Sequence, residues 1–370
     1  MSKAEILAKL HDIATNPKAS LDRYLAEGKK VVAMAPVYTP EEIIHSMGLV
    51  PMGVWGADKE VNEAKKYYPA FICSIMQTVL ELGITGAYKG VSALIVPSLC
   101  DSLKTLGQNW KYAVKDIPFI PMNYPQNRKP EYGIKFTKSQ YERVIRDLEE
   151  YTGAKFDNEA LKKSNKIYNE HNAVMREFSK VAAEYEISNE ARTDVYKSAW
   201  FMLKEEHSAL VKELISELKK GEKAKESARV LVTGILSDAR ALVETLDKNG
   251  IKVVADDVAA QSRQYRVDIK DMDDALEALA IKFSDMDNCT LLYDRDKKRI
   301  DYIIKEAKEN GAGGVVVLMT KFCDPEEFDY VPIKRACEAN GLMHINIEVD
   351  RQMVNYEQAA TMLQAFAEML

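Results

Sequence analysis

The chain has 370 residues, of which 46% are hydrophobic, and a formal net charge of −6 at pH 7. This composition excludes intrinsic disorder, and the lack of a basic stripe interleaved with aromatic residues argues against a nucleic-acid partner. No apolar stretch approaches the roughly 20 residues that a membrane-spanning helix needs, which argues against a membrane protein. The length favours two α/β domains, because one hydrophobic core rarely fills so long a chain.

The amino-terminal part of the chain predicts alternating strands and helices. Its first ten residues, MSKAEILAKL, are typical of a charged amphipathic helix and not of a signal peptide, so we expect a cytoplasmic protein with reduced thiols. Apolar runs without polar alternation predict buried parallel strands at 29–36, 49–56 and 117–125 and within 91–101, with helices at 40–47, 70–82 and 101–113. This order indicates a doubly wound parallel sheet, which we assign to a first domain over residues 1–140.

A helical period of 3.6 residues replaces this pattern from about residue 141. Two long amphipathic helices are expected, one that begins after a capping Asp157 and one over 194–221 that ends at Gly221. Their charged residues indicate a solvated face, with an oligomer or partner interface as the alternative. We interpret residues 141–225 as a helical connector.

The last third of the chain repeats the order of the first. Strands are expected at 229–236, 251–257 and 344–350 and within the run 313–324, with helices at 238–250, 273–286, 326–340 and 357–370. Residues 226–370 therefore predict a second doubly wound domain that resembles the first. Open α/β domains bind ligands at the carboxyl ends of their strands, so we expect a shared cleft there.

The most informative residues are cysteines. Cys100 and Cys323 each follow a buried strand and directly precede an aspartate, and Cys73 opens a helix. The unpaired N–H groups at the start of the following helix are expected to lower each thiol pKa. Three thiolates at one cleft, with a fourth ligand position open, fit an iron–sulfur cluster, and soft sulfur ligands also suit Cu(I) or zinc. Cys289 and Cys337 are interpreted as ordinary buried thiols.

Common catalytic motifs do not occur in the sequence. It lacks G-x-x-x-x-G-K-[ST], H-E-x-x-H and G-x-S-x-G, and the glycines at 311–314 precede a strand where a dinucleotide fingerprint must follow one. A nicotinamide dehydrogenase is therefore disfavoured. The five histidines are scattered along the chain, which is typical of surface or satisfied core positions.

Long motifs spread over nearly all 370 residues resemble the 2-hydroxyacyl-CoA dehydratases, specifically their β subunits, a group that includes benzoyl-CoA reductase subunits. The motifs are PVYTPEEIIHSMGLVPMGVWG (36–56), YYPAFICSIMQ (67–77), PSLCDSLKTLGQNWK (97–111), YPQNRK (124–129), VVADDVAAQSRQYRVD (253–268), MTKFCDPEEFDY (319–330) and the final QAFAEML. By this resemblance Cys73, Cys100 and Cys323 are ligands of a 4Fe–4S cluster in the cleft between the two domains.

The resemblance also implies a radical elimination of water from an (R)-2-hydroxyacyl-CoA in amino-acid or lactate fermentation. A separate ATP-dependent iron–sulfur activator protein would supply one electron, the thioester carbonyl would become a ketyl radical anion, and loss of the α-hydroxyl would lead to the 2-enoyl-CoA. A homologous α subunit would bind the acyl-CoA, so this chain would be one half of a heterodimer. The segments around Cys73 and Cys323 are most similar to members that act on lactyl-, 2-hydroxyisocaproyl- or phenyllactyl-CoA, and 2-hydroxyglutaryl-CoA stays open.

Several residues are candidate neighbours of the cluster or its pocket. Tyr38 and Trp55 are expected to border the pocket, with core packing as the alternative. Asp101 and Asp324 are expected to orient neighbouring groups, with capping of their helices as the alternative. No catalytic residue is assigned.

Basic residues near the motifs have two interpretations. Lys321, Arg263 and Arg266 either balance cluster charge or meet CoA phosphates, or else they form surface salt bridges. Two other functions remain open for the whole chain: a subunit of a benzoyl-CoA-type reductase, and a metal-free two-domain binding protein.

Overall fold

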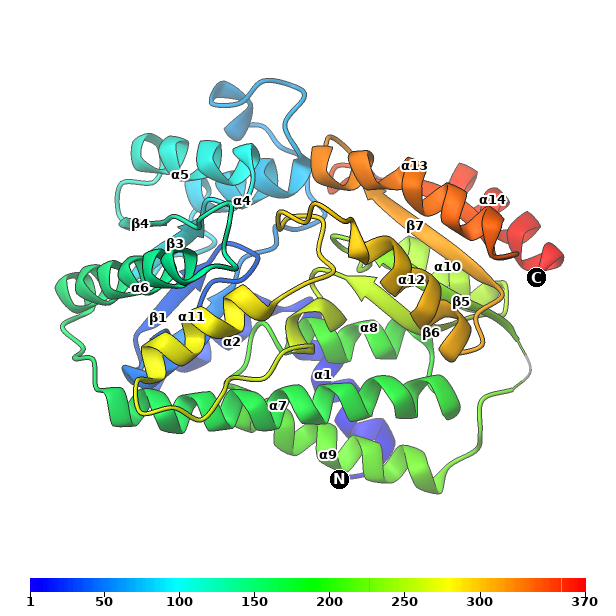
Figure 1. The fold of residues 1–370 in the computed structure, drawn as a ribbon, viewed down its shortest axis with the longest axis horizontal. Helices are drawn as coiled ribbons and strands as arrows, with labels where there is room; N and C mark the ends of the chain where they lie inside the picture. Colours follow the sequence, from blue (N-terminus) through cyan, green and yellow to red (C-terminus); the bar gives the residue numbers. More distant parts are fainter. Residues whose placement is uncertain (226, 354) are drawn as a thin grey trace.

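A computed structural model describes residues 1–225, 227–353 and 355–370, so residue 226, where the predicted second domain begins, lies outside the described residues. It contains two sheets of four parallel strands each (Figure 1). The first sheet has the order β2-β1-β3-β4, with β1 (Val31–Met34), β2 (Val50–Gly53), β3 (Ala93–Pro97) and β4 (Phe119–Met122). The second has the order β6-β5-β7-β8, with β5 (Ala228–Gly234), β6 (Ile251–Val258), β7 (Gly314–Thr320) and β8 (Met343–Val349). The predicted α/β fold with two domains is confirmed, and both sheets share one strand order.

Helices cover both faces of the first sheet. Alternate strand residues belong to different cores: Val31 and Ala33 face one side, whereas Val32 and Met34 face the other. The first side packs against α2 (Pro17–Ala26), α4 (Ser74–Ile84) and α5 (Asp101–Ala113), and the short helix η1 (Ala64–Lys66) precedes α4. The second side packs against α3 (Glu41–Ser46) and α6 (Glu131–Thr152). Because both faces are covered, the strands are continuous apolar runs.

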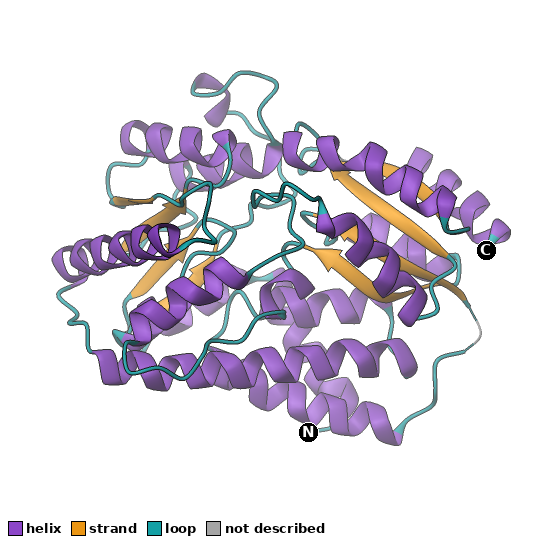
Figure 2. Cartoon of the chain, in the orientation of Figure 1, coloured by secondary structure: helices purple, strands orange, loops and turns teal. Residues whose placement is uncertain are grey.

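The second sheet is covered in the same way. One face packs against α12 (Lys298–Glu309) and α13 (Asp324–Ala339), and the other packs against α10 (Arg240–Lys248) and α14 (Glu357–Met369). A short helix η2 (Ser262–Tyr265) follows β6. The two sheets and their helices lie side by side in Figure 2.

The connection between β6 and β7 differs from the prediction. One helix was expected there, but two are present, α11 (Ala275–Asp285) and α12. Helix α11 crosses back and packs against α6 and α7 beside the first sheet, where Lys282 pairs with Glu42 at 2.6 Å. Helix α12 makes the crossover on the second sheet. An amphipathic pattern predicts a helix but does not identify the surface that its apolar face will cover.

Four further helices form a layer that supports both sheets: α1 (Lys3–Thr15), α7 (Asn158–Glu184), α8 (Asn189–Ser198) and α9 (Lys204–Lys220). Helix α7 runs along the lower edge of the molecule in Figure 1. Asp157 caps it as predicted, by accepting a hydrogen bond from the Ala160 N–H at 2.7 Å. Among the described helices, none is long and apolar enough to cross a membrane.

The helix predicted over 194–221 is interrupted at 199–203, between α8 and α9. The interruption places Trp200 between the two domains. The Trp200 carbonyl accepts a hydrogen bond from Gly53 N–H at 2.9 Å in the first domain, and its indole N–H donates to the Ala260 carbonyl at 2.9 Å in the second. Tertiary contacts of one aromatic residue therefore override a helical pattern.

A buried histidine pair lies in the helical layer. His171 on α7 and His207 on α9 are both fully buried, and His171 Nε2 lies 3.0 Å from His207 Nδ1. His207 Nε2 lies 2.9 Å from the Val195 carbonyl, which only accepts, so His207 Nδ1 accepts from His171. Burial lowers the pKa of His171 well below its ordinary value and lowers that of His207 to about 3. Both rings are therefore neutral in the folded protein.

We expect stability to fall below pH 6.5 because of this pair. The unfolded chain protonates both histidines below that pH, whereas the folded chain does not, so each histidine removes roughly 1.4 kcal/mol of unfolding free energy per pH unit. Urea unfolding between pH 7.5 and 5.5 measures this slope. His207→Gln should make the slope shallower by about the contribution of one histidine, and an unchanged slope would contradict the assignment.

Gly56 brings the end of the first sheet into contact with α4. Its φ is +73°, and a Cβ built there would lie 2.1 Å from the Thr78 Oγ1 on α4. Gly28 has nearly the same φ, +74°, but a Cβ there would meet no atom within 4 Å. Substitution of either glycine would therefore carry a similar backbone cost, but only substitution of Gly56 would also cause a steric clash.

Gly56→Ala should destabilise the protein more than Gly28→Ala. Both variants carry the left-handed backbone cost of about 1–2 kcal/mol, and only the first adds overpacking of about 1–3 kcal/mol against α4. Urea denaturation of the two variants gives the difference directly. Equal losses would show that α4 moves away from residue 56 without cost.

Candidate metal centre

The carboxyl edges of the two sheets bring three cysteines together. Cys100 follows β3 and is the N-cap residue of α5, and Cys323 follows β7 and is the N-cap residue of α13. Cys73 is the N-cap residue of α4. The three helices lie along the upper edge of the molecule in Figure 1. All three cysteines meet at one hydrophobic core, which contains Cys73 and against which Cys100 and Cys323 pack.

Each of these helices begins without a side-chain cap. The first N–H groups of each helix act on its cysteine sulfur instead: those of Ile75 and Met76 on Cys73, and that of Leu103 on Cys100. Unpaired N–H groups and the positive end of the helix dipole stabilise negative charge. Three helix starts are thus directed at one group of sulfur atoms.

The expected lowering of the thiol pKa is wrong, because burial outweighs the helix N–H groups. Burial raises the pKa of Cys73, raises that of Cys100 to about 12, and raises that of Cys323 well above its ordinary value. Thiolates at these positions therefore need a cation to stabilise them. A bound metal deprotonates a coordinating thiol outright, and soft sulfur donors select iron–sulfur clusters, Cu(I) or zinc. Among the described residues these three sulfur atoms do not form a group within 4.8 Å of one another, so they fit the wider spacing of a metal–sulfur cluster and not a single zinc or Cu(I) ion.

The backbone around this region is strained at two aromatic residues. Tyr38, which follows β1, has a φ of +62°, and Phe322, directly before Cys323, has a φ of +61°. A bulky residue rarely adopts this left-handed conformation, which costs about 1–3 kcal/mol and is concentrated at functional sites. The strain at Phe322 sets the direction in which the chain enters Cys323.

Tyr38 and Trp55 both belong to the apolar core that also contains Cys73. Tyr38 packs edge-on against Phe283 at 6.2 Å. Trp55 packs edge-on against Trp200 at 5.1 Å, and its indole N–H is buried without a hydrogen-bond partner. Both side chains are therefore core residues, which is the alternative that the sequence left open.

Asp101 and Asp324 do not cap their helices, because the cysteines before them occupy the N-cap positions. Each aspartate is the first helical residue, where a negative charge interacts favourably with the helix dipole. Asp101 is exposed and pairs with Lys104 at 3.1 Å. Lys321 pairs with Glu348 at 3.6 Å.

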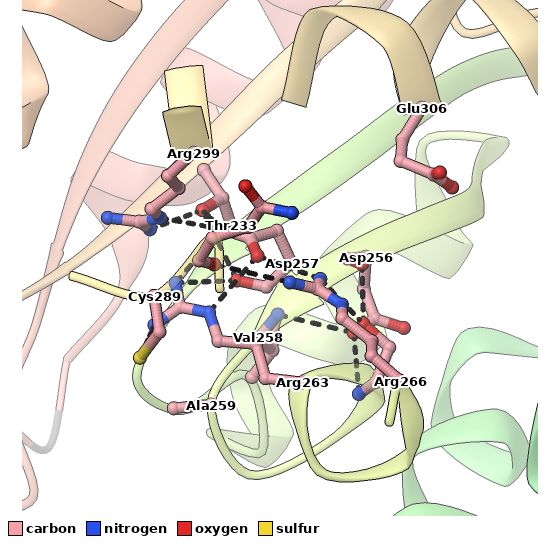
Figure 3. A network of polar contacts seen from close by, with 12 residues as sticks. Thr233, Asp256, Asp257, Val258, Ala259, Arg263, Arg266, Cys289, Arg299 and Glu306 are labelled. Carbon is pink, nitrogen blue, oxygen red and sulfur yellow. Dashed lines mark hydrogen bonds and ion pairs between the residues drawn. The ribbon is translucent and has the colours of Figure 1, made fainter. Parts of the chain in front are cut away.

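A surface salt bridge is wrong for Arg263, whose side chain is 1% exposed, and Arg266, which is 16% exposed, belongs to the same largely buried ion network (Figure 3). Both bind Asp257 at the end of β6, at 3.0 and 2.8 Å. Arg299 on α12 binds the same carboxylate at 2.8 Å. Burial alone would raise the pKa of Asp257, but the three arginines outweigh it and hold the pKa well below its ordinary value.

Four charged members of this network were missed from the sequence: Asp257, Arg299, Glu326 and Asp329, which pairs with Arg299 at 2.9 Å. Glu326 on α13 is 1% exposed and accepts from both Arg263, at 3.1 Å, and Arg299, at 2.8 Å. The available signal was the pair of acidic residues at 256–257, since charges at the end of a buried strand need partners.

Arg351 connects the two domains beside Cys73. Its guanidinium is 6% exposed and pairs with Asp58 at 2.9 Å in the first domain and with Asp238 at 3.0 Å in the second. Its backbone N–H donates to the Ser74 Oγ at 3.0 Å, at the first residue of α4. The sequence motifs gave no sign of this bridge.

Comparison with known proteins places this chain in a family. Residues 36–370 match the family described as "2-hydroxyglutaryl-CoA dehydratase, D-component". The chain is 46% identical to an (R)-phenyllactyl-CoA dehydratase beta subunit from Clostridium sporogenes, covering 97% of each chain. It is 45% identical to a lactoyl-CoA dehydratase subunit beta from Anaerotignum propionicum and 38% identical to an (R)-2-hydroxyglutaryl-CoA dehydratase subunit beta from Acidaminococcus fermentans, covering all of each chain in both cases. The chain therefore belongs to the 2-hydroxyglutaryl-CoA dehydratase D-component family.

Proposed function

We propose that this chain is the β subunit of a 2-hydroxyacyl-CoA dehydratase, a hydro-lyase that converts an (R)-2-hydroxyacyl-CoA to the 2-enoyl-CoA in fermentation. Cys73, Cys100 and Cys323 hold a 4Fe–4S cluster in this proposal. The observation that carries it is the convergence of three thiols at three uncapped helix starts. The names of the relatives, all beta subunits of 2-hydroxyacyl-CoA dehydratases, support the reaction.

The protein residues have distinct roles in this proposal. A bound cluster would supply single-electron transfer, which acid–base groups alone do not provide. The thiolates bind it, the helix N–H groups offset its negative charge, and the apolar core that contains Tyr38, Trp55 and Cys73 excludes water from one side. The buried arginines pair with Glu326 and so hold the start of α13, whose N-cap residue is Cys323.

The acyl group is proposed to be apolar and short, branched or aromatic. The two relatives at 46% and 45% identity are named for phenyllactyl-CoA and lactoyl-CoA, whereas the relative at 38% is named for 2-hydroxyglutaryl-CoA. The same comparison favours a dehydratase over a benzoyl-CoA-type reductase. A metal-free binding protein is the alternative that iron analysis tests.

A homologous α subunit and an ATP-dependent activator complete the proposed enzyme, which we expect in the cytoplasm, where the five free cysteines stay reduced. Exposed aromatic residues support an interface at the thiol face. Phe71 is 71% exposed two residues before Cys73, and Phe328 is 76% exposed on α13. Exposed aromatic side chains are enriched at protein interfaces.

Replacing each proposed ligand with alanine should sharply lower the iron content of anaerobically purified protein, because two thiolates hold a cluster poorly. Cys337→Ala is the matched control for Cys323→Ala, since both cysteines lie on or at the start of α13. Cys289→Ala provides a second control. Full iron in any of the three ligand variants would remove that residue from the ligand set, and iron loss in the controls would point to general unfolding.

Phe328→Glu should weaken association with the co-expressed α subunit, because it places a charge in an apolar interface. Tyr132→Glu, at a residue 66% exposed on α6, is the control and should not affect co-purification. Both variants should keep their iron and their unfolding temperature. Undiminished binding by Phe328→Glu would place the interface elsewhere.

A further inference from the structure

Glu326 connects a cysteine-bearing helix to the buried ion network. It is the third residue of α13, and Cys323 is the N-cap of that helix. Its carboxylate lies between Arg263 and Arg299, with distances of 3.1 and 2.8 Å. All three side chains are at most 3% exposed, so these ion pairs are shielded from water and salt.

The two arginines anchor Glu326 to the second sheet. Both also bind Asp257 at the carboxyl end of β6, and Arg299 donates a further hydrogen bond to Thr233 Oγ1 on β5 at 2.8 Å. Figure 3 shows Arg263, Arg299 and Thr233 gathered around Asp257. The start of α13 is therefore held by arginines from η2 and α12, which are themselves bound to β5 and β6, and not by a capping side chain.

Glu326 also acts on Cys323 itself. Its backbone N–H is one of the N–H groups at the start of α13 that have no intrahelical partner, three residues after Cys323, and its carboxylate places a buried negative charge in the same turn. Hydrogen bonds to cluster sulfur and the net charge around a cluster are the two features by which a protein sets its reduction potential. Glu326 can thus affect both the hydrogen bonding and the net charge around Cys323.

We propose that Glu326 is a positioning residue for the metal centre, which fixes the first turn of α13 around Cys323 and keeps the reduction potential of the cluster low. This inference rests on the proposed function, because it assumes that Cys323 binds the cluster. Glu327 provides a matched control: it is the next residue on the same helix and carries the same charge, but it is exposed and belongs to no ion pair among the described residues.

The test compares Glu326→Gln, Glu326→Asp and Glu327→Gln after anaerobic reconstitution with iron and sulfide. Titration with titanium(III) citrate, which donates one electron and becomes titanium(IV), gives the midpoint potential, and the rate of iron loss to a chelator reports how well the ligands are held. Glu326→Gln should shift the potential to a more positive value, speed iron loss several-fold and lower the unfolding temperature of the iron-free protein. Glu327→Gln should match the unchanged protein in all three measurements.

Glu326→Asp separates position from charge, and it carries the test if Glu326→Gln does not fold. The shorter side chain keeps the charge but does not reach both arginines, so iron loss should be faster while the potential changes little. Iron loss and potential in the Glu326 variants equal to those of Glu327→Gln would overturn the inference. Failure of the unchanged protein to take up iron would instead overturn the proposed function, so the two failures are distinguishable.

Discussion

The burial of three thiols, which the proposed cluster would need as thiolates, is the constraint on which the proposed site depends. Burial raises the pKa of Cys73, Cys100 and Cys323, so the charged form is costly at this place without a cation. The fold reduces this cost by aiming three helix N-termini at the sulfur atoms. A metal–sulfur cluster would supply the remaining stabilisation, and its binding energy would then be coupled to the docking of the two domains.

The thiols come from both domains, so the proposed site can form only while the domains are held together. The Trp200 turn contacts the backbone of both, and the buried Arg351 pairs with a carboxylate from each. The Arg351–Asp238 pair is buried, and removing one partner of such a pair typically costs about 3–5 kcal/mol. Asp58 is 50% exposed, so the Arg351–Asp58 pair across the domain boundary contributes less. Arg351 therefore matters far more to the geometry of the site than the many surface pairs of the connecting helices.

Much of the architecture was predictable because the strands are buried on both faces. Continuous apolar runs such as 31–34 and 314–320 can be recognised as buried strands from the sequence. A cysteine at the end of such a run must lie at the carboxyl edge of its sheet. Helix α12, the docking of α11 on the other domain and the break at Trp200 were not predictable, because a local pattern does not identify a distant packing partner. The direction in which the pKa of each thiol shifts depends on how deeply the folded chain buries that thiol. The buried position of Arg263 depends on its ion pairs with Asp257 and Glu326. Glu326 lies 63 residues away from Arg263 in the sequence.

The central claim is that one iron–sulfur cluster binds where the two domains meet. Its most direct test is the iron and acid-labile sulfide content, with the visible absorption spectrum, of the unaltered chain after anaerobic reconstitution and desalting. The account predicts about four iron and four sulfide per chain, together with the broad visible absorption of a 4Fe–4S cluster. A desalted protein that carries no iron, or that carries iron without sulfide, would contradict it.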